Sequence, residues 1–255
     1  MKGPSVQSLP AIDALRAKIR LIEAGEKRAP GVLPFGLPEM DARLPGGGLA
    51  RGALHEVAGG GTGAVHAAAA SLFAAGIAAR SGGPVLWCVA RRDLFAPALA
   101  QAGLPPERVV HVEAGDEEGI LACFEEGLRH NGLTAVAAEV QRLSLTNSRR
   151  LQLAAESAGT IGIAIRRWRR QADAVDFGQA TASATRWRVT ALPQISSRIP
   201  GLARARWQVE LIRCRGGGCA DFELEGCDAQ GRLGLPAGVA DRSSGAGIGR
   251  QRAAS

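Results

Sequence analysis

The sequence predicts an α/β protein of three layers, with a mainly parallel central sheet and an antiparallel β extension. Three observations lead to this fold class. Short apolar runs rich in Val, Ile, Leu and Ala alternate with helical stretches through the middle of the chain. A glycine-rich turn separates the first of these runs from an alanine-rich stretch of helical length. Beyond Ile165 the pattern changes to alternating apolar and polar residues, which is typical of antiparallel strands.

The elements are expected in a regular order along the chain. The first helix carries apolar residues at helical spacing, namely Ile12, Leu15, Ile19 and Ile22. The expected parallel strands are 53–57, 85–90, 109–112, 134–140 and 161–165. The expected helices between them are 64–80, 93–102, 117–130 and 146–157. The extension should consist of strands 187–192, 206–213 and 221–225, because these segments alternate and lie about a hairpin apart.

We expect three parts along the chain. Residues 1–32 form an N-terminal helix and linker, residues 33–235 form the core domain, and residues 236–255 form a disordered tail rich in Gly, Ser and Arg. No apolar run approaches the roughly 20 residues of a membrane span, and no secretory signal is evident, so we expect a cytoplasmic protein. The five scattered cysteines fit no zinc spacing, so we expect reduced thiols and no metal site.

The net charge of +7 is unevenly distributed. Residues 160–255 carry 15 Arg, no Lys and 8 Asp/Glu, so this part holds the whole excess. A one-sided basic balance predicts an anionic partner, most often nucleic acid. The alternative is the arginine usage of a GC-rich genome, which would spread arginine evenly.

Residues 53–65 have the layout of a phosphate-binding loop. In the motif G-x-x-x-x-G-K-[ST], backbone N–H groups and a lysine contact the phosphates, and a hydroxyl holds magnesium. Aligned on the last glycine of the turn, the lysine and hydroxyl positions hold Ala64 and Val65, and the first glycine is Ala58. The segment is therefore either a nucleotide-binding fold that no longer hydrolyses nucleotide, or merely a glycine-rich turn. The turn residues are Gly59, Gly60, Gly61, Thr62 and Gly63.

One passage carries a more specific resemblance. The stretch FGLPEMDARLPGGGLARGALHEV, residues 35–57, matches the entry to the phosphate loop of bacterial recombinases. There a glycine-marked turn, an Asp in a short helix and a Gly-Gly-Leu-x-x-Gly turn precede the first core strand. The chain resembles the RecA-like core of these recombinases from about Leu33 to Leu224. Within that group it looks most like the ImuA family, the RecA-related accessory proteins of damage-inducible mutagenesis.

The resemblance implies that the nucleotide site is degenerate. The catalytic glutamate of a recombinase follows the second core strand, where this chain has Arg91 and Arg92. The Walker B strand ends here in Glu139, and the sensor glutamine is replaced by Arg166 and Arg167. Because catalysis of phosphoryl transfer is mostly electrostatic positioning, these losses imply an absence of ATPase activity. No cofactor is implied, and weak nucleotide binding through the backbone loop stays open.

Two further expectations concern charge at the strand ends. A carboxylate held without its metal needs a cation, so we expect Glu139 to pair with Arg91, Arg92 or Arg167. Recombinases of this group bind DNA with two loops, of which the first, 141–148, is short here. The second, 166–186, opens with four arginines and is the better candidate for contact with DNA or an acidic protein. The candidate contact residues are Arg166, Arg167, Arg169, Arg170 and Arg186.

Three function classes follow. The leading one, implied by the resemblance, is a non-catalytic RecA-like adaptor of the SOS response and DNA repair, in error-prone translesion DNA synthesis. Its implied partners are a Y-family-like protein, an error-prone replicative-type polymerase and the RecA recombinase, with DNA left open, no membrane, and nucleoid association after DNA damage. The second is a SulA-type inhibitor of the tubulin-like division protein, which the length of the chain disfavours. The third is a divergent RecA-like ATPase, which Ala64 and Val65 disfavour.

Overall fold

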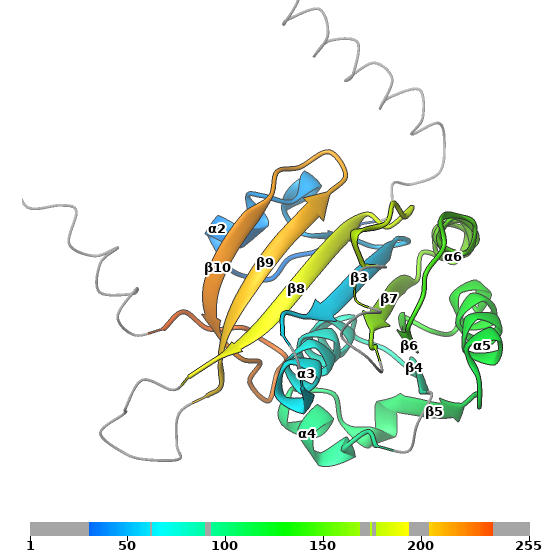
Figure 1. Cartoon of the computed structure of the whole chain (residues 1–255), viewed down its shortest axis with the longest axis horizontal. Helices are drawn as coiled ribbons and strands as arrows, with labels where there is room; N and C mark the ends of the chain where they lie inside the picture. Colours follow the sequence, from blue (N-terminus) through cyan, green and yellow to red (C-terminus); the bar gives the residue numbers. More distant parts are fainter. Residues whose placement is uncertain are drawn as a thin grey trace, which may run out of the picture. The chain divides into compact units, whose positions relative to one another are not determined.

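The computed structural model describes residues 31–61, 63–89, 93–168, 174, 177–193 and 204–236. The predicted N-terminal helix, and the predicted tail apart from Pro236, lie outside these residues. The described chain folds around one eight-stranded sheet with the order β10-β9-β8-β3-β7-β6-β4-β5 (Figure 1). None of the described helices is long and apolar enough to cross a membrane.

The predicted α/β alternation is confirmed. The parallel strands are β3 (Leu54–Gly59), β4 (Val85–Val89), β5 (Val109–Glu113), β6 (Ala135–Val140) and β7 (Ile161–Arg166). The helices between them are α3 (Ala64–Arg80), α4 (Ala96–Gln101), α5 (Glu117–Arg129) and α6 (Leu145–Ala158). A short 3-10 turn, Pro106–Arg108, leads into β5. Each predicted boundary lies within three residues of the observed one.

The predicted antiparallel extension is also confirmed. It consists of β8 (Thr185–Leu192), β9 (Arg206–Cys214) and β10 (Ala220–Glu225), and β9 pairs antiparallel with both neighbours. Strand β8 pairs in parallel with β3, so the extension continues the same sheet. The register of the β8–β9 pair shifts between Arg186 and Trp187, as at a β-bulge.

The entry passage is a compact unit ahead of β3. Strands β1 (Val32–Leu33) and β2 (Leu49–Ala50) pair antiparallel, with α2 (Pro38–Asp41) and the 3-10 turn Pro45–Gly47 between them. The Asp41 carboxylate accepts the backbone N–H groups of Phe35 at 2.7 Å and Gly36 at 2.9 Å. Gly36 has a φ of +79°, which favours glycine. The Gly and Asp of this passage therefore form one turn.

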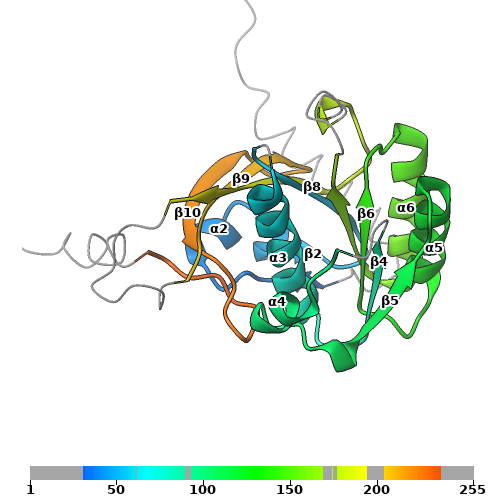
Figure 2. The ribbon, with the colours of Figure 1, turned by 60° about the horizontal axis from the view of Figure 1, so that its bottom comes forward.

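Helices cover both faces of the sheet (Figure 2). On one face α3, α4 and the entry passage bury a core around Phe73, Trp87 and Trp187. On the other face α5 and α6 pack on a second core that includes Phe124 and Leu128. This three-layer arrangement leaves the carboxyl ends of the parallel strands at one edge, where sites in such folds are usually built.

Candidate functional site

The glycine loop joins β3 to α3 at the carboxyl edge of the parallel strands, as predicted. Gly59 ends β3 and Gly63, with a φ of +97°, precedes the first turn of α3. The loop is tied to the sheet because the N–H of Gly60 donates to the Val189 carbonyl at 2.9 Å. Thr62 lies outside the described residues.

Close packing explains why the loop needs glycine. A Cβ on Gly59 would lie 2.8 Å from the His66 carbonyl, and one on Gly60 would lie 1.7 Å from Thr190 Oγ1. A Cβ on Gly61 would lie 2.7 Å from the His66 ring. The loop is therefore held between β8 and the first turn of α3, and larger residues would displace it.

The two positions that would carry the lysine and the hydroxyl carry neither. Ala64 begins α3, and the Val65 side chain is 67% exposed to solvent. The first turn of α3 contains no acidic residue, and no side chain caps it. What remains at this end of the helix is backbone N–H and the helix dipole.

Glu139 forms an ion pair at the strand ends. It is 3% exposed near the end of β6, and its Oε2 accepts Arg167 Nη1 at 2.9 Å. Arg167 Nη1 and Nη2 also donate to Asp93 Oδ1 at 2.8 Å and Oδ2 at 2.5 Å. The expected pair of Glu139 with an arginine is thus present with Arg167, whereas Arg91 and Arg92 lie outside the described residues. Asp93, directly after those two arginines, is a member that sequence reasoning missed.

The Asp93–Arg167–Glu139 set joins the ends of three strands. Arg167 follows β7, Glu139 belongs to β6, and Asp93 lies between β4 and α4. The hydrogen bonds with Asp93 come first among the causes that raise the pKa of Arg167 above its ordinary value, and the charge of Glu139 adds to them. The guanidinium therefore stays charged at any physiological pH.

A groove of about 320 Å³ opens beside this set, between α3 and α4. Its lining is mostly apolar, and the three charged residues lie among the lining side chains. Phe95, at the start of α4, is 67% exposed. The apolar and small lining residues are Ala64, Ala67, Ala68, Ser71, Leu72, Leu94, Phe95, Ala98 and Leu99.

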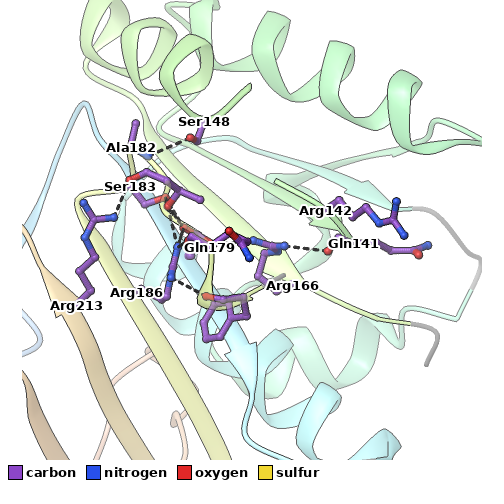
Figure 3. Close-up of polar contacts among 12 residues, drawn as sticks. Gln141, Arg142, Ser148, Arg166, Gln179, Ala182, Ser183, Arg186 and Arg213 are labelled. Atoms are coloured by element: carbon purple, nitrogen blue, oxygen red, sulfur yellow. Dashed lines mark hydrogen bonds and ion pairs between the residues drawn. The ribbon is translucent and has the colours of Figure 1, made fainter. Parts of the chain in front are cut away.

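The prediction of an exposed arginine loop is wrong for Arg166 and Arg186. The side chain of Arg166 is 0% exposed and that of Arg186 is 7% exposed, and both form ion pairs with the buried carboxylate of Glu56. Figure 3 shows how the two arginines lie. The physical reason is that a fully buried carboxylate requires cationic partners. Arg167 has a 28% exposed side chain engaged with two carboxylates.

The other sequence expectations for this region concern Arg169, Arg170 and the loop 141–148. Arg169 and Arg170 lie outside the described residues, so their role stays a prediction. The start of the short loop 141–148 is hydrogen-bonded to α5. Glu117 Oε1 accepts the N–H groups of Gln141 at 2.9 Å and Arg142 at 2.6 Å. The buried Glu56, in the middle of β3, carried no motif that could have revealed it.

Comparison with known proteins identifies the chain's relatives. No family model matches it. It is 40% identical over 218 residues to the Protein ImuA of two strains of Caulobacter vibrioides, over 82% of this chain and 88% of each relative. This chain belongs to the ImuA family.

The solved structures confirm the fold of this ImuA-family protein. The crystal structure of the RadB recombinase superposes with a TM-score of 0.55 over 80% of this chain and 99% of that one. The sequence identity is 17%, so this likeness shows the RecA-like fold alone. The resemblance that the entry passage carried is therefore confirmed for both family and fold.

The chemistry of the described site in this ImuA-family protein is limited. Backbone N–H groups of the loop and the start of α3 favour an anion. The carboxylates of Glu139 and Asp93 are both engaged by the Arg167 guanidinium. The described residues at this edge thus combine an apolar groove with two carboxylates that are already paired with Arg167.

Proposed function

We propose that this ImuA-family protein is a non-catalytic RecA-like adaptor in SOS-induced, error-prone translesion DNA synthesis during damage-inducible mutagenesis. It links a Y-family-like polymerase relative with an error-prone replicative-type polymerase, and it contacts the RecA recombinase. The observation that carries the proposal is the position of Arg167, whose guanidinium bridges Glu139 and Asp93 at the strand ends.

The electrostatics of this set disfavour ATP hydrolysis. Hydrolysis at a phosphate loop depends on a magnesium ion and cationic side chains that neutralise charge developing on the phosphates. Glu139 is the carboxylate at the end of β6, and Arg167 already neutralises it. Magnesium would have to displace a hydrogen-bonded guanidinium, and Ala64 and Val65 supply no ammonium or hydroxyl to help it. The fold therefore keeps the shape of a nucleotide site without the charges that catalysis uses.

The surface beside the loop favours a protein partner. Val65 and Phe95 are both 67% exposed, and Ala64 and Phe95 line the same apolar groove. Large exposed apolar side chains grouped beside a groove are typical of protein interaction sites. An adaptor would use this edge for binding where an ATPase uses it for catalysis.

A pull-down from DNA-damaged cells tests the proposal. The tagged chain is recovered after damage, and the two polymerase-type proteins, the recombinase and the tubulin-like division protein are each probed. Recovery of the polymerase-type proteins supports the adaptor. Recovery of the division protein alone supports the SulA-type alternative. A Val65→Asp/Phe95→Asp variant that still folds and still recovers both polymerases would exclude the groove edge as the docking surface.

Direct DNA contact needs its own measurement. Each phosphate that a protein cation neutralises releases counterions, so affinity for DNA falls as salt rises. Arg169→Ala/Arg170→Ala should reduce the slope of log affinity against log salt by about 1–2 units if these arginines contact phosphates. An Arg149→Ala variant, at an exposed position on α6, is the matched control. An unchanged slope with loss of the polymerase partner would identify protein docking.

A further inference from the structure

The connection from β7 to β8 must cross another strand. In the sheet, β3 lies between β7 and β8, and it pairs in parallel with both. Parallel strands of this kind are usually joined by a helix that packs on the strand being crossed. The described part of this crossover, residues 167–184, contains no α-helix. The contacts that the described residues of this crossover make with β3 are therefore not those of an apolar helix face.

Glu56 lies on β3 under the crossover. It is opposite Arg186 on β8 and Ala164 on β7, and its side chain is 0% exposed. Its Oε2 accepts Arg166 Nη1 at 2.8 Å, and its Oε1 accepts Arg186 Nη2 at 3.1 Å. Arg166 ends β7, and Arg186 is the second residue of β8. One carboxylate therefore binds both ends of the crossover.

The same carboxylate also binds the crossover itself. Glu56 Oε1 accepts the hydroxyl of Ser183 at 2.7 Å and the hydroxyl of Thr181. Two buried hydroxyls, two guanidiniums and one carboxylate thus form a buried polar set that joins β3 to Arg166 and to residues 181–186. The set takes the place of the apolar contacts that a crossover helix would make.

The two guanidiniums extend the set to backbone carbonyls. Arg186 Nη1 donates to Phe177 O at 2.6 Å, and Nη2 donates to Gln179 O at 2.8 Å. Arg166 Nη2 donates to Gln141 O at 2.9 Å, next to the end of β6 (Figure 3). The Phe177 ring lies 5.0 Å from Arg186 Cζ, which adds a cation–π contact. The carbonyls of Phe177 and Gln179 are therefore held by a guanidinium that Glu56 neutralises.

We infer that Glu56 is the positioning residue for residues 177–184 of the β7–β8 crossover, and that it sets the surface that the exposed residues 178–180 present to the polymerase-type partners. The second half of this inference rests on the proposed function, and the first half stands without it. The charges show why Glu56 is decisive. Neutralising Glu56 removes the anion that pairs with two buried guanidiniums, and the loss of one partner from a buried ion pair is strongly destabilising.

Glu56→Gln is the primary test, because it keeps the volume and one oxygen acceptor while removing the charge. Two crossover amides report closure, since Ala182 N–H donates to Ser148 Oγ at 3.0 Å and Ala184 N–H donates to Leu54 O at 2.7 Å. In hydrogen exchange, residues 177–184 of Glu56→Gln should exchange roughly tenfold faster or more, while α3 keeps its protection. Unchanged exchange in residues 177–184 overturns the inference.

Glu125→Gln is a matched control elsewhere in the fold. Glu125 also pairs with two arginines, Arg129 and Arg150, each at 2.5 Å. Those arginine side chains are 54% and 62% exposed, so water solvates them when the carboxylate is neutralised. Hydrogen exchange of residues 177–184 in Glu125→Gln should therefore match that of the unchanged chain. Equal opening of the crossover in both variants would contradict a role specific to Glu56.

A double variant separates charge from packing. Glu56→Gln/Arg166→Gln restores the net charge that this buried set has in the unchanged chain, so it should recover much of the crossover protection lost in Glu56→Gln. A purely steric role predicts that the second change adds further loss. If both variants unfold throughout with no local step, Glu56 supports the whole core and the inference is wrong.

Partner recovery completes the test. Glu56→Gln should lose the polymerase-type proteins at least severalfold in the pull-down, and the double variant should regain them together with its protection. If the crossover opens but recovery is unchanged, the crossover is not the partner surface and this half of the inference fails. If the unchanged chain recovers no polymerase, the proposed function fails, while the exchange result still decides the positioning role.

Discussion

Arg167 and Glu139 form an ion pair, with Nη1 2.9 Å from Oε2, between the ends of the neighbouring strands β7 and β6. Arg167 follows directly on Arg166, and the two guanidiniums bind different acids. Arg166 pairs with Glu56 inside the fold, whereas Arg167 reaches Glu139 and Asp93 beside the groove. Two adjacent arginines therefore stabilise two separate carboxylate sites.

Removal of Arg167 should destabilise the protein. Arg167→Ala leaves Glu139, whose side chain is 2% exposed, with a buried charge and without this cation. Because Arg167 itself is 28% exposed, we expect a loss of about 2 kcal/mol in the free energy of unfolding, below the range for fully buried pairs. Denaturant titration measures it. Arg149→Ala, on the exposed face of α6, should change stability by less than about 0.5 kcal/mol. Equal effects of the two variants would show that the Arg167 pair contributes nothing.

The purified protein should not hydrolyse ATP. Ala64→Lys/Val65→Thr should not restore turnover, because Glu139 and Asp93 remain engaged by Arg167. Steady-state phosphate release is the measurement, with heat-inactivated protein as the control. Turnover above this control that disappears when Gly63 is changed to Ala would refute the prediction.

His55 is held neutral within a chain of hydrogen bonds. Trp187 Nε1 donates to Thr185 Oγ1 at 2.7 Å, Thr185 lies 2.8 Å from His55 Nδ1, and His55 Nε2 lies 2.9 Å from the Ala50 carbonyl. The carbonyl can only accept, so Nε2 carries the proton and Nδ1 accepts from the threonine hydroxyl. Burial lowers the pKa of His55 to about 4, and the bond to Ala50 offsets this only in part.

This pKa predicts that acid destabilises the fold. The folded pKa lies below the unfolded value, so protons bind the unfolded state first, and stability is lost as the pH falls from about 7 towards 4. The His55 contribution to this loss is roughly 3 kcal/mol. His55→Gln keeps a hydrogen-bond donor and an acceptor but has no group that titrates. The stability of this variant relative to the unchanged chain should therefore increase as the pH falls. Denaturant midpoints between pH 7 and 4.5 measure this, with His111→Gln on β5 as the exposed control. Parallel pH profiles for all three proteins would contradict the assignment.

Gly76 in α3 allows close approach of the segment after β10. A Cβ at this position would lie 2.2 Å from Cys227 Sγ and 3.1 Å from the Gly231 carbonyl. Gly76→Ala should therefore lower stability by about 1–3 kcal/mol, even though alanine is the better helix former. Thermal melting should show a fall of several degrees.

Two variants test the steric reason for this effect. Gly218→Ala, at a position with open space around it, should leave the melting temperature nearly unchanged. Gly76→Ala/Cys227→Ala removes the sulfur and should recover part of the loss. No recovery in the double variant would assign the effect to the Gly231 carbonyl.

The order of strands and helices was predictable from the sequence because it depends on local periodicity. The apolar runs around Val85 and Ile161 and the alanine-rich stretch after Gly63 each signal their own element. The glycine loop was predictable for the same reason, since its strand, turn and helix are contiguous. That Ala64 and Val65 stand at the lysine and hydroxyl positions of the motif could likewise be read from the sequence alone.

Which acidic residue pairs with which arginine was decided only by the tertiary structure. Glu139 was expected to find an arginine, but Asp93 as the second acid, and Arg167 as the bridge, depend on the ends of three separate strands meeting at one edge. Arg166 and Arg186 read in the sequence as a solvent-exposed basic loop. They are buried because β3, far away in sequence, places Glu56 between β7 and β8. Sequence periodicity indicates which residues share an element, whereas the pairing of buried charges depends on which strands become neighbours.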